Sequence, residues 1–268
     1  MELNRSRMTV ADVRALKGVR QMSMVYVQKL EEAAACAAAG IDVLSIEQQF
    51  WNTDMREAAG DCFVQVGLNY GRLATTDDYL RAGHDAMLLG GDCCYCAASP
   101  EVITRLSAEG IPIVGHVGLI PSRRTWTGGF KAVGRTLESA QLVMEQIRSL
   151  ERSGAFAAEI EVVPAAVTQA IAERTSLVLF SMGAGTGGDA QYLFAEDILG
   201  YTPGHQPRHA KVYRDFRAEY DRLQRERVAA FSEFRADVAS GAYPEERHLV
   251  GVDDEVLGAF IQSLNDHS

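Results

Sequence analysis

The sequence lacks two features that would each point to a particular kind of partner. No apolar run reaches the roughly 20 residues that a membrane-spanning helix needs. Basic residues are in the minority, with 26 Lys and Arg against 36 Asp and Glu, and the formal net charge is −10. Such a charge disfavours nucleic acid or an anionic membrane surface as the main partner. A small molecule is therefore the expected ligand.

Cysteines are few and odd in number, which excludes a complete disulfide framework. Five are present, at positions 36, 62, 93, 94 and 96, in a chain of 268 residues that can bury a core without crosslinks. The polar residues 1–7 lead into a helical pattern rather than into the apolar run of a signal peptide. We therefore expect reduced thiols and a cytoplasmic protein.

Short apolar runs alternate with helical stretches along most of the chain, which predicts a parallel sheet. The expected strands are residues 22–27, 43–46, 63–68, 86–89, 113–118, 156–163, 177–185 and 192–194. Their number favours a closed (β/α)8 TIM-type barrel of the α/β class, and an open Rossmann-like sheet is the alternative. We expect a single barrel domain over residues 1–268.

A different pattern begins near residue 208, where a long charged helix is expected to run to about residue 241. A second helical pattern covers residues 256–264. These segments are predicted to form a helical C-terminal extension that covers a barrel end or a neighbouring subunit. The apolar stripe of the long helix consists of Phe216, Tyr220, Leu223, Val228, Phe231 and Phe234.

Two glycine-rich loops after the fifth expected strand form the most specific part of the sequence. They are residues 115–121, Gly-His-Val-Gly-Leu-Ile-Pro, and residues 128–136. Catalytic groups of barrels lie on loops at the carboxyl ends of strands, where glycine lets the backbone approach a ligand. His116 could donate a hydrogen bond to a carbonyl or enolate oxygen there, although a histidine at a strand end is more often structural. Lys131 and Arg135, taken alone, are solvated loop charges.

These loops resemble those of the ketopantoate hydroxymethyltransferase family, which carries Gly-His-(Leu/Ile/Val)-Gly-Leu-Thr-Pro and then Gly-Gly-(Tyr/Phe)-Lys-Val-Gln-Gly-Arg. Residues 161–164, Glu-Val-Val-Pro, are similar to its Glu-Cys-Val-Pro after strand six, and residues 182–185, Met-Gly-Ala-Gly, to its Ile-Gly-Ala-Gly after strand seven. Asp189, Gln191 and Asp197 match its next segment. The resemblance covers about residues 111–243.

The resemblance implies chemistry at the carbon beside the carbonyl of an α-keto acid, to which the family adds a hydroxymethyl group carried by methylenetetrahydrofolate. It implies Glu161 as the general base and His116 as a residue that binds substrate. It also makes Lys131, Arg135 and Ser181 candidates for substrate binding. A weakly acidic α-proton needs a positioned carboxylate, and the enolate oxygen needs a hydrogen-bond donor or a cation.

A second carboxylate, Glu159, lies two residues before Glu161 on the same expected strand. Side chains of a strand alternate between its two faces, so both carboxylates are predicted to point to the same side. The simplest interpretation of either residue is a salt-bridged glutamate of the barrel wall. The resemblance favours a functional role for Glu161 and leaves Glu159 open.

The aspartates with which the family binds a divalent cation are missing. Counting along the chain places Gln48 and Gly67 at those two positions, and Gln49 where the family has a serine that binds substrate. Gln48 and Gln49 are therefore further candidates for substrate binding. Neutral amides are poor replacements for carboxylates around magnesium, so no ordinary metal site is expected, and Glu47 is a weak candidate ligand.

Strand four departs from the family in a similar way, because its Lys-Ile-Glu is expected at residues 88–90, Leu-Leu-Gly. The following Cys93, Cys94 and Cys96 have a spacing that differs from the paired Cys-x2-Cys clips of zinc sites. We expect them to be buried or loop thiols, and a nucleophilic thiol is a minor alternative.

Functions of different classes follow from these observations. The first is a hydroxymethyltransferase or aldolase-like enzyme that makes or breaks a carbon–carbon bond next to the carbonyl of a keto acid. It would act in pantothenate biosynthesis or be retasked to another reaction, and it would work without a metal. By analogy with the family we expect a homo-oligomer. The alternative is a catalytically silent barrel that binds a metabolite or assembles with an active paralogue. A third, a relative of the phosphoenolpyruvate mutase and isocitrate lyase group, needs an acidic metal cluster that the sequence does not supply.

Overall fold

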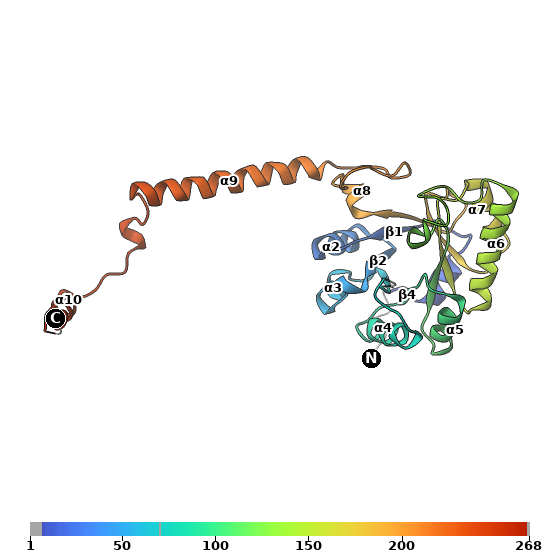
Figure 1. The fold of residues 1–268 in the computed structure, drawn as a ribbon, viewed down its shortest axis with the longest axis horizontal. Helices are drawn as coiled ribbons and strands as arrows, with labels where there is room; N and C mark the ends of the chain where they lie inside the picture. The colour runs from blue at the N-terminus through green and yellow to red at the C-terminus, as the bar shows by residue number, and fades with distance from the viewer. Residues whose placement is uncertain (1–6, 70, 267–268) are drawn as a thin grey trace. The chain divides into compact units, whose positions relative to one another are not determined.

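A computed structural model describes residues 7–69 and 71–266 of the chain. Eight parallel strands pair in sequence order, and the last pairs with the first, so the sheet closes into a barrel (Figure 1). The predicted (β/α)8 barrel is confirmed, and the open sheet is excluded. The strands are β1 (Met22–Tyr26), β2 (Val43–Glu47), β3 (Phe63–Gly67), β4 (Cys93–Tyr95), β5 (Ile113–Gly118), β6 (Ala157–Glu161), β7 (Val178–Met182) and β8 (Ala190–Phe194).

Helices surround the barrel on its outside (Figure 1). Several begin with a threonine whose side chain caps the first turn, as Thr75 does for α4 and Thr136 for α6. The helices are α1 (Val10–Ala15), α2 (Leu30–Ala39), α3 (Thr53–Ala58), α4 (Thr76–Leu88), α5 (Pro100–Ala108), α6 (Leu137–Arg152), α7 (Ala165–Ala172) and α8 (Ala195–Leu199), with short 3-10 turns η1 (Gln48–Phe50) and η2 (Pro121–Arg123).

The fourth strand lies later in the chain than predicted. The apolar residues 86–88 are the last residues of α4, Leu89 is its C-cap, and Gly90 follows with a φ of +89° that ends the helical conformation. The strand itself is the short β4, and its last residue is Tyr95. The expectation that residues 88–90 stand at the end of strand four is therefore wrong, and Tyr95 stands there instead.

The barrel interior changes from apolar to polar along its axis. Inward side chains near the amino ends of the strands form an apolar cluster that includes Met22, Val43, Phe63, Cys93, Val114 and Phe180. Nearer the carboxyl ends, buried polar side chains follow on the same inner face: Ser45, Gln65, His116, Glu159, Glu161 and Tyr192. Because polar groups are costly to bury without a function or partners, this end of the barrel is the candidate site.

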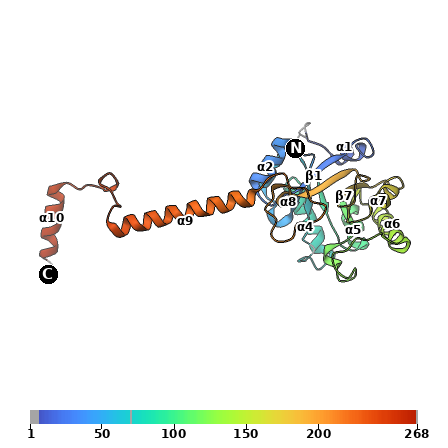
Figure 2. The ribbon, with the colours of Figure 1, turned by 90° about the horizontal axis from the view of Figure 1, so that it is seen from above.

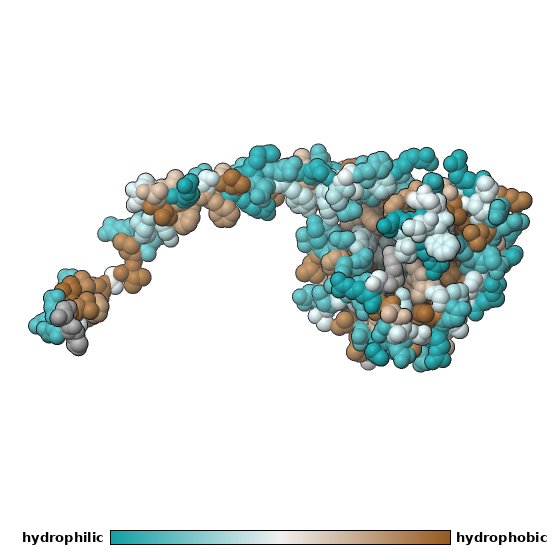
Figure 3. All heavy atoms as spheres, viewed as in Figure 1, coloured by the Kyte–Doolittle hydropathy of each residue, from teal (hydrophilic) through white to brown (hydrophobic). Residues whose placement is uncertain are grey.

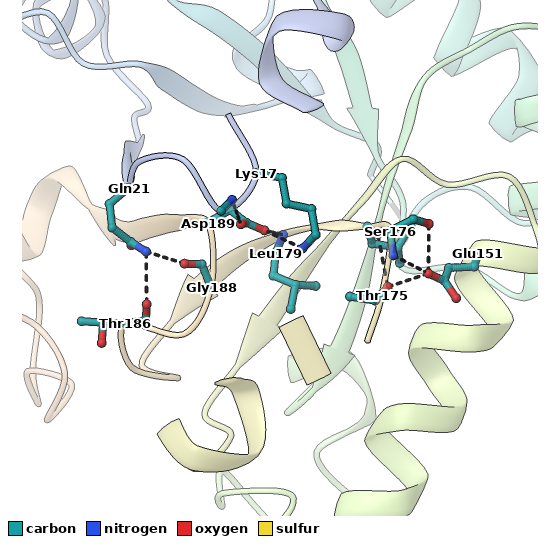
Figure 4. A network of polar contacts seen from close by, with 11 residues as sticks. Lys17, Gln21, Glu151, Thr175, Ser176, Leu179, Thr186, Gly188 and Asp189 are labelled. Atoms are coloured by element: carbon teal, nitrogen blue, oxygen red, sulfur yellow. Dashed lines mark hydrogen bonds and ion pairs between the residues drawn. The ribbon is translucent and has the colours of Figure 1, made fainter. Parts of the chain in front are cut away.

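The opposite end of the barrel is tied together by hydrogen bonds to two carboxylates (Figure 4). Asp189, just before β8, accepts from the backbone N–H groups of Gly18 (3.1 Å) and Leu179 (2.8 Å) and pairs with Lys17 Nζ at 3.2 Å. Glu151 at the end of α6 accepts in the same way from the segment that precedes β7. These contacts join the amino ends of the strands and stabilise the barrel away from the candidate site.

Residues from Asp215 onwards form a second compact unit. It contains α9 (Phe216–Ser240), the 3-10 turn η3 (Glu246–His248) and α10 (Asp254–Asn265). The long helix begins later than residue 208, because Tyr213 N donates to Ile198 O at 2.8 Å and Asp215 caps the helix through Ala218 N at 3.1 Å. The barrel unit thus extends to Arg214.

The helices of the second unit present apolar side chains on their surfaces. Figure 2 shows α9 as one uninterrupted helix, and Figure 3 shows apolar residues along part of α9 and over α10. In the predicted stripe of α9, the exposed fraction is 39% at Tyr220 and 72% at Phe231. Neither of these helices nor any other in the described residues has the length and apolar character needed to cross a membrane.

Candidate active site

His116 lies near the end of β5 with its ring inside the barrel, where only 2% of the side chain is exposed. Its Nε2 atom is 2.8 Å from the carbonyl oxygen of Leu119 and 3.2 Å from Oε2 of Glu161. A carbonyl oxygen can only accept a hydrogen bond, so Nε2 carries a proton. The ring is thereby fixed in one orientation beside the carboxylate of Glu161.

Gly118 allows the loop after β5 to pass directly beside β6. Its φ is +84°, and a Cβ atom at this position would lie 2.4 Å from the carbonyl oxygen of Glu161. The next residue, Leu119, donates its N–H to that same oxygen at 2.9 Å. Glycine is required here for the close approach of two protein segments, whereas the sequence pattern had suggested the approach of a ligand.

Glu161 ends β6 and is followed by a strained residue. Val162 has a φ of +49°, in the left-handed region that β-branched residues rarely adopt, at a cost of about 1–3 kcal/mol. Its N–H donates to Met182 O at 2.9 Å, and its carbonyl oxygen accepts from Val133 N at 3.1 Å. These bonds hold the sharp turn, which leaves the Glu161 side chain at the strand end with 11% of its surface exposed.

The other ring nitrogen of His116 faces a second set of polar groups. Nδ1 is 2.7 Å from the hydroxyl oxygen of Tyr95 and 3.5 Å from Oε2 of Glu159. Oε1 of Glu159 accepts from Gln65 Nε2 at 2.7 Å, and this amide also lies 3.0 Å from Ser45 Oγ. The prediction that Glu159 points to the same side of the strand as Glu161 is confirmed, since the two carboxylates contact the same ring.

Burial and charge both perturb the protons of this group. Burial raises the pKa of Glu159 to about 7. Burial alone lowers the pKa of His116, but the hydrogen bond that the ring donates to Glu161 and the charges of Glu159 and Glu161 outweigh burial, so the pKa of the imidazole is raised. Perturbed titratable groups that contact one another in a cleft are typical of catalytic sites.

The residues after β2 lie at the same end of the barrel. Gln48 and Gln49 form η1, directly after the strand that ends with Glu47. Gln49 Nε2 donates to Glu47 Oε2 at 2.7 Å, and burial followed by the nearby Glu47 charge raises the pKa of Tyr26. The structure thus places both glutamines at the mouth, without a hydrogen bond to His116 or Glu161 among the described residues.

The remaining predicted substrate-binding residues make no hydrogen bond or ion pair with His116 in the described part of the chain. Lys131 and Arg135 are exposed on the loop between η2 and α6. Ser181 alternates with the inward residues Phe180 and Met182 of β7, so it faces the outside of the sheet, and its hydroxyl donates to Gly185 O at 2.7 Å. It is buried in the barrel wall and is not part of the polar group around His116.

The residues at the family's cation-binding positions do not fit such a site. Gly67 ends β3 without a side chain, and Gln48 offers only a neutral amide. Within residues 7–69 and 71–266, no group of three or more His, Cys, Asp or Glu is arranged to hold a metal ion. A hard divalent cation prefers several oxygen ligands with negative charge, which this mouth does not bring together at those positions.

The cysteines of β4 and the loop after it are buried thiols, as predicted. Cys93 belongs to the apolar cluster inside the barrel, whereas Cys94 and Cys96 pack between the strands and the surrounding helices. Burial raises the pKa of Cys94 to about 12 and that of Cys96 to about 11, and it raises the pKa of Cys93 as well. The thiolate that nucleophilic catalysis requires is disfavoured at all three.

Sequence reasoning missed Tyr95 and Gln65 as members of the site. Tyr95 was hidden because the fourth strand was placed too early, and a strand at 93–95 would have put this tyrosine at its carboxyl end. Gln65 lies on the third predicted strand, and the available signal was that it shares the inward face of this strand with Phe63 and Gly67.

Comparisons with known sequences identify relatives of this chain. The profile of the family described as ketopantoate hydroxymethyltransferase matches residues 76–246. The 3-methyl-2-oxobutanoate hydroxymethyltransferase of Thermus thermophilus is 31% identical in an alignment 268 positions long, which covers 90% of this chain and 99% of that protein. The protein of the same name from Cenarchaeum symbiosum is 33% identical over 192 residues, with 72% and 67% covered.

Solved structures share the barrel at low sequence identity. A candidate phosphonomutase from Burkholderia cenocepacia superposes with a TM-score of 0.54 and 14% identity, covering 85% of this chain and all of the other. The carboxyl transferase domain of Rhizobium etli pyruvate carboxylase, solved with pyruvate, gives a TM-score of 0.52 and 12% identity, covering 70% of this chain and 42% of that one. At such identities the likeness shows the fold alone.

Proposed function

Since the chain belongs to the ketopantoate hydroxymethyltransferase family of enzymes, we propose that it acts at the carbon next to the carbonyl of an α-keto acid. The observation that carries this proposal is the buried contact of 3.2 Å between His116 Nε2 and Glu161 Oε2. It pairs a carboxylate at a strand end with a ring that can hold positive charge. Removal of a proton beside a carbonyl requires both kinds of group.

Glu161 is the proposed general base. Its carboxylate takes the proton from the carbon next to the carbonyl, the electron pair of the broken C–H bond forms the enolate double bond, and the negative charge moves to the carbonyl oxygen. The turn at Val162 and the partial exposure of the Glu161 side chain support this role, because they keep the carboxylate at the mouth of the barrel.

His116 is the proposed source of positive charge near the developing enolate. Its ring already has acceptors or carboxylates at both nitrogens, so it acts on the substrate through its charge and its neighbours. The absence of carboxylates at Gln48 and Gly67 supports a reaction in which this charge, rather than a bound divalent cation, compensates the enolate.

The proposed substrate is an α-keto acid, and the names of the relatives point to 3-methyl-2-oxobutanoate. Methylenetetrahydrofolate is the proposed one-carbon donor. In the net reaction both carbon–nitrogen bonds of the methylene group break: the enolate carbon replaces one nitrogen on the methylene carbon, and the oxygen of water replaces the other. The two nitrogens take up the proton that Glu161 removed and one proton of water, and tetrahydrofolate is released. The changed residues at Gln48, Gln49 and Gly67 also suit a retasked enzyme that takes a different keto acid or donor.

A homo-oligomer is proposed as the working form. The apolar side chains on α9 and α10, such as Phe231 and Phe260, are exposed in the single chain and would gain stability from burial against another copy. The free thiols, of which Cys62, Cys93, Cys94 and Cys96 are buried, support a reducing compartment, and we propose the cytoplasm.

The test is exchange of the C3 proton of 3-methyl-2-oxobutanoate for deuterium, followed by NMR in the presence and absence of a chelator. We expect exchange that survives chelation and is lost in Glu161→Gln. Restoration by magnesium after chelation would overturn the metal-independent mechanism. Absence of exchange with this and other α-keto acids would favour the alternative, a silent barrel that binds a metabolite or assembles with an active paralogue.

A further inference from the structure

We propose that Tyr95 is a further catalytic residue, whose hydroxyl donates a hydrogen bond to the carbonyl oxygen that becomes the enolate. We also propose that Glu159 is a positioning residue, which sets the direction of the Tyr95 hydrogen bond through His116. This inference rests on the proposed function and names the donor that serves the enolate at the same site.

Each nitrogen of the His116 ring faces a hydrogen-bond partner. Nε2 must carry a proton because it faces the carbonyl oxygen of Leu119 at 2.8 Å. The contact of 2.7 Å between Nδ1 and the Tyr95 hydroxyl then has two forms. If Nδ1 is bare, the hydroxyl donates to it. If Nδ1 is protonated, it donates to the tyrosine oxygen, and the hydroxyl proton turns toward another acceptor. A single proton on Nδ1 therefore decides where Tyr95 donates.

A carboxylate beside the His116 ring controls whether Nδ1 carries a proton. Among the described residues, the titratable groups that contact the His116 ring are Glu161 and Glu159 from β6 and Tyr95 from β4. Glu161 contacts Nε2, so Glu159, at 3.5 Å, is the carboxylate at Nδ1. An ionised Glu159 stabilises the protonated form of Nδ1, because opposite charges at this distance in a buried site attract strongly.

Glu159 is the group beside Nδ1 of His116 whose charge can change near neutral pH, because two further titratable groups that face it stay neutral there. Tyr192 from β8 and Cys93 from β4 also face this carboxylate, and burial raises the pKa of both, so they stay neutral near neutral pH. Gln65 is fully buried and donates to Glu159, although this orientation leaves its own Oε1 without a hydrogen-bond partner among the described residues. A buried amide that forgoes one hydrogen bond to hold a carboxylate indicates a site built around that carboxylate.

Tyr95 and the proposed base, Glu161, contact different nitrogens of the His116 ring. Tyr95 is the last residue of β4, half-buried and directed inward, and its ring meets the His116 ring edge-on at 5.8 Å between centroids. Glu161 contacts the other nitrogen of the same ring. The carbonyl oxygen of a keto acid and its α-proton are close neighbours in the molecule, so a donor and a base that flank one imidazole can serve them together.

The first experiment measures the protonation of His116 without any substrate. The protein is labelled with nitrogen-15 at histidine, and His116 is assigned by the loss of its signals in His116→Asn. We expect the midpoint of the His116 titration to fall by about one pH unit in Glu159→Gln, and to return toward the original value in Glu159→Asp. Glu47→Gln, which removes a different carboxylate of the mouth, is the control. An unchanged midpoint in Glu159→Gln would overturn the positioning role.

The second experiment measures deuterium exchange of 3-methyl-2-oxobutanoate by the intact protein and its variants. Tyr95→Phe is expected to lower the exchange rate about 100-fold, which is the usual effect of removing one donor to a developing oxyanion. Tyr26→Phe is the matched control, because this hydroxyl accepts from Gln28 at 2.9 Å elsewhere in the mouth. Equal rates in Tyr95→Phe and the unmodified protein would overturn the catalytic role, provided that both give the same thermal unfolding curve.

The two experiments separate this inference from the proposed function. If the titration behaves as expected and no α-keto acid exchanges its proton, the arrangement of Glu159 and His116 stands, and both the proposed reaction and the role of Tyr95 in it are rejected. If exchange occurs with an unshifted titration, the reaction stands and the control of Tyr95 by Glu159 is rejected.

Discussion

The carbonyl oxygen of Glu161 accepts the N–H of Leu119 at 2.9 Å, so the residue that carries the proposed base also anchors the loop that orients the histidine. Leu119 completes the link, because its own carbonyl oxygen lies 2.8 Å from His116 Nε2. The side chain of Glu161 then contacts the same nitrogen at 3.2 Å. A displacement of either strand end would therefore disturb the base and the imidazole together.

Gly118→Ala is expected to damage this link. The new Cβ atom would meet Glu161 O at 2.4 Å, on a residue whose φ is +84°, so the free energy of unfolding should fall by about 2–4 kcal/mol and exchange activity should be lost. Gly110→Ala is the matched control, since its φ is +79° but nothing lies within 4 Å of the added atom. Urea denaturation compares the two, and equal losses would show that the contact with Glu161 is unimportant.

Val162 offers a test of stored strain. Val162→Gly removes the side chain that disfavours a φ of +49°, whereas Val162→Ala removes the branches and keeps the strained Cβ atom. The glycine variant should be more stable than the alanine variant by about 1 kcal/mol, yet slower in substrate exchange because the turn after Glu161 is looser. An alanine variant at least as stable as the glycine variant would argue against strain.

The pH dependence of stability should depend on Glu159. Burial raises the pKa of this carboxyl from 4.5 to about 7, so the folded state binds its proton more tightly than the unfolded state does. The corresponding stability is complete below pH 4.5 and is lost as the pH rises through about 7. The raised pKa of His116 acts in the same direction.

Glu159→Gln should therefore flatten the decline in the free energy of unfolding between about pH 5 and pH 8. Urea denaturation at several pH values measures this slope. Glu151→Gln is the control, since this carboxylate lies at the opposite end of the barrel. Burial raises the pKa of Glu151, but the hydrogen bonds from Thr175 and Ser176 together outweigh burial, so its pKa is lowered. An equally steep decline in Glu159→Gln and the unmodified protein would contradict the prediction.

The double variant Gln48→Asp, Gly67→Asp should introduce magnesium binding. A Cβ atom at Gly67 would have Glu47 Cα at 3.6 Å and Tyr95 Cδ1 at 3.8 Å as neighbours, which are ordinary contacts, so a Cβ atom fits there. Isothermal titration calorimetry should detect binding in the double variant and none in the unmodified protein. Tight magnesium binding before mutation would show that other oxygen ligands assemble a site at this mouth.

The apolar surfaces of α9 and α10 predict an oligomer that weakens when charge is introduced. Phe231→Asp and Phe260→Asp each replace an exposed apolar side chain with a carboxylate, which would have to lose its hydration if it were buried between copies. Sedimentation velocity should show a shift toward a single chain in both variants. Arg225→Asp, which changes charge at a polar position of α9, serves as the comparison.

Much of the barrel followed from periodicity, because parallel strands buried on both faces leave clear apolar runs. β4 was the exception, since three residues, Cys93, Cys94 and Tyr95, give too short a signal beside the apolar end of α4. The start of α9 was also misplaced, because the hydrogen bond from Tyr213 to Ile198 that precedes it joins segments on either side of a loop. Such tertiary contacts leave no local pattern in the sequence.

Part of the candidate site could be predicted for a similar reason. The alternation of a strand was enough to place Glu159 and Glu161 on one side. It was not enough to show that His116 lies between them, since that depends on the register of β5 against β6, where His116 pairs with Glu159. Ser181 shows the converse, because a residue near a recognised motif can face the wrong side of its strand.

The contacts of Asp189 have a consequence for the folding of the chain during its synthesis on the ribosome. Gly18 and Asp189, which are hydrogen-bonded in the folded barrel, are 171 residues apart, and β1 finds its second neighbour only when β8 has been synthesised. Until then the first strand keeps an open edge that can pair with other chains. Nascent chains that stall before residue 189 should therefore be the species most in need of chaperones.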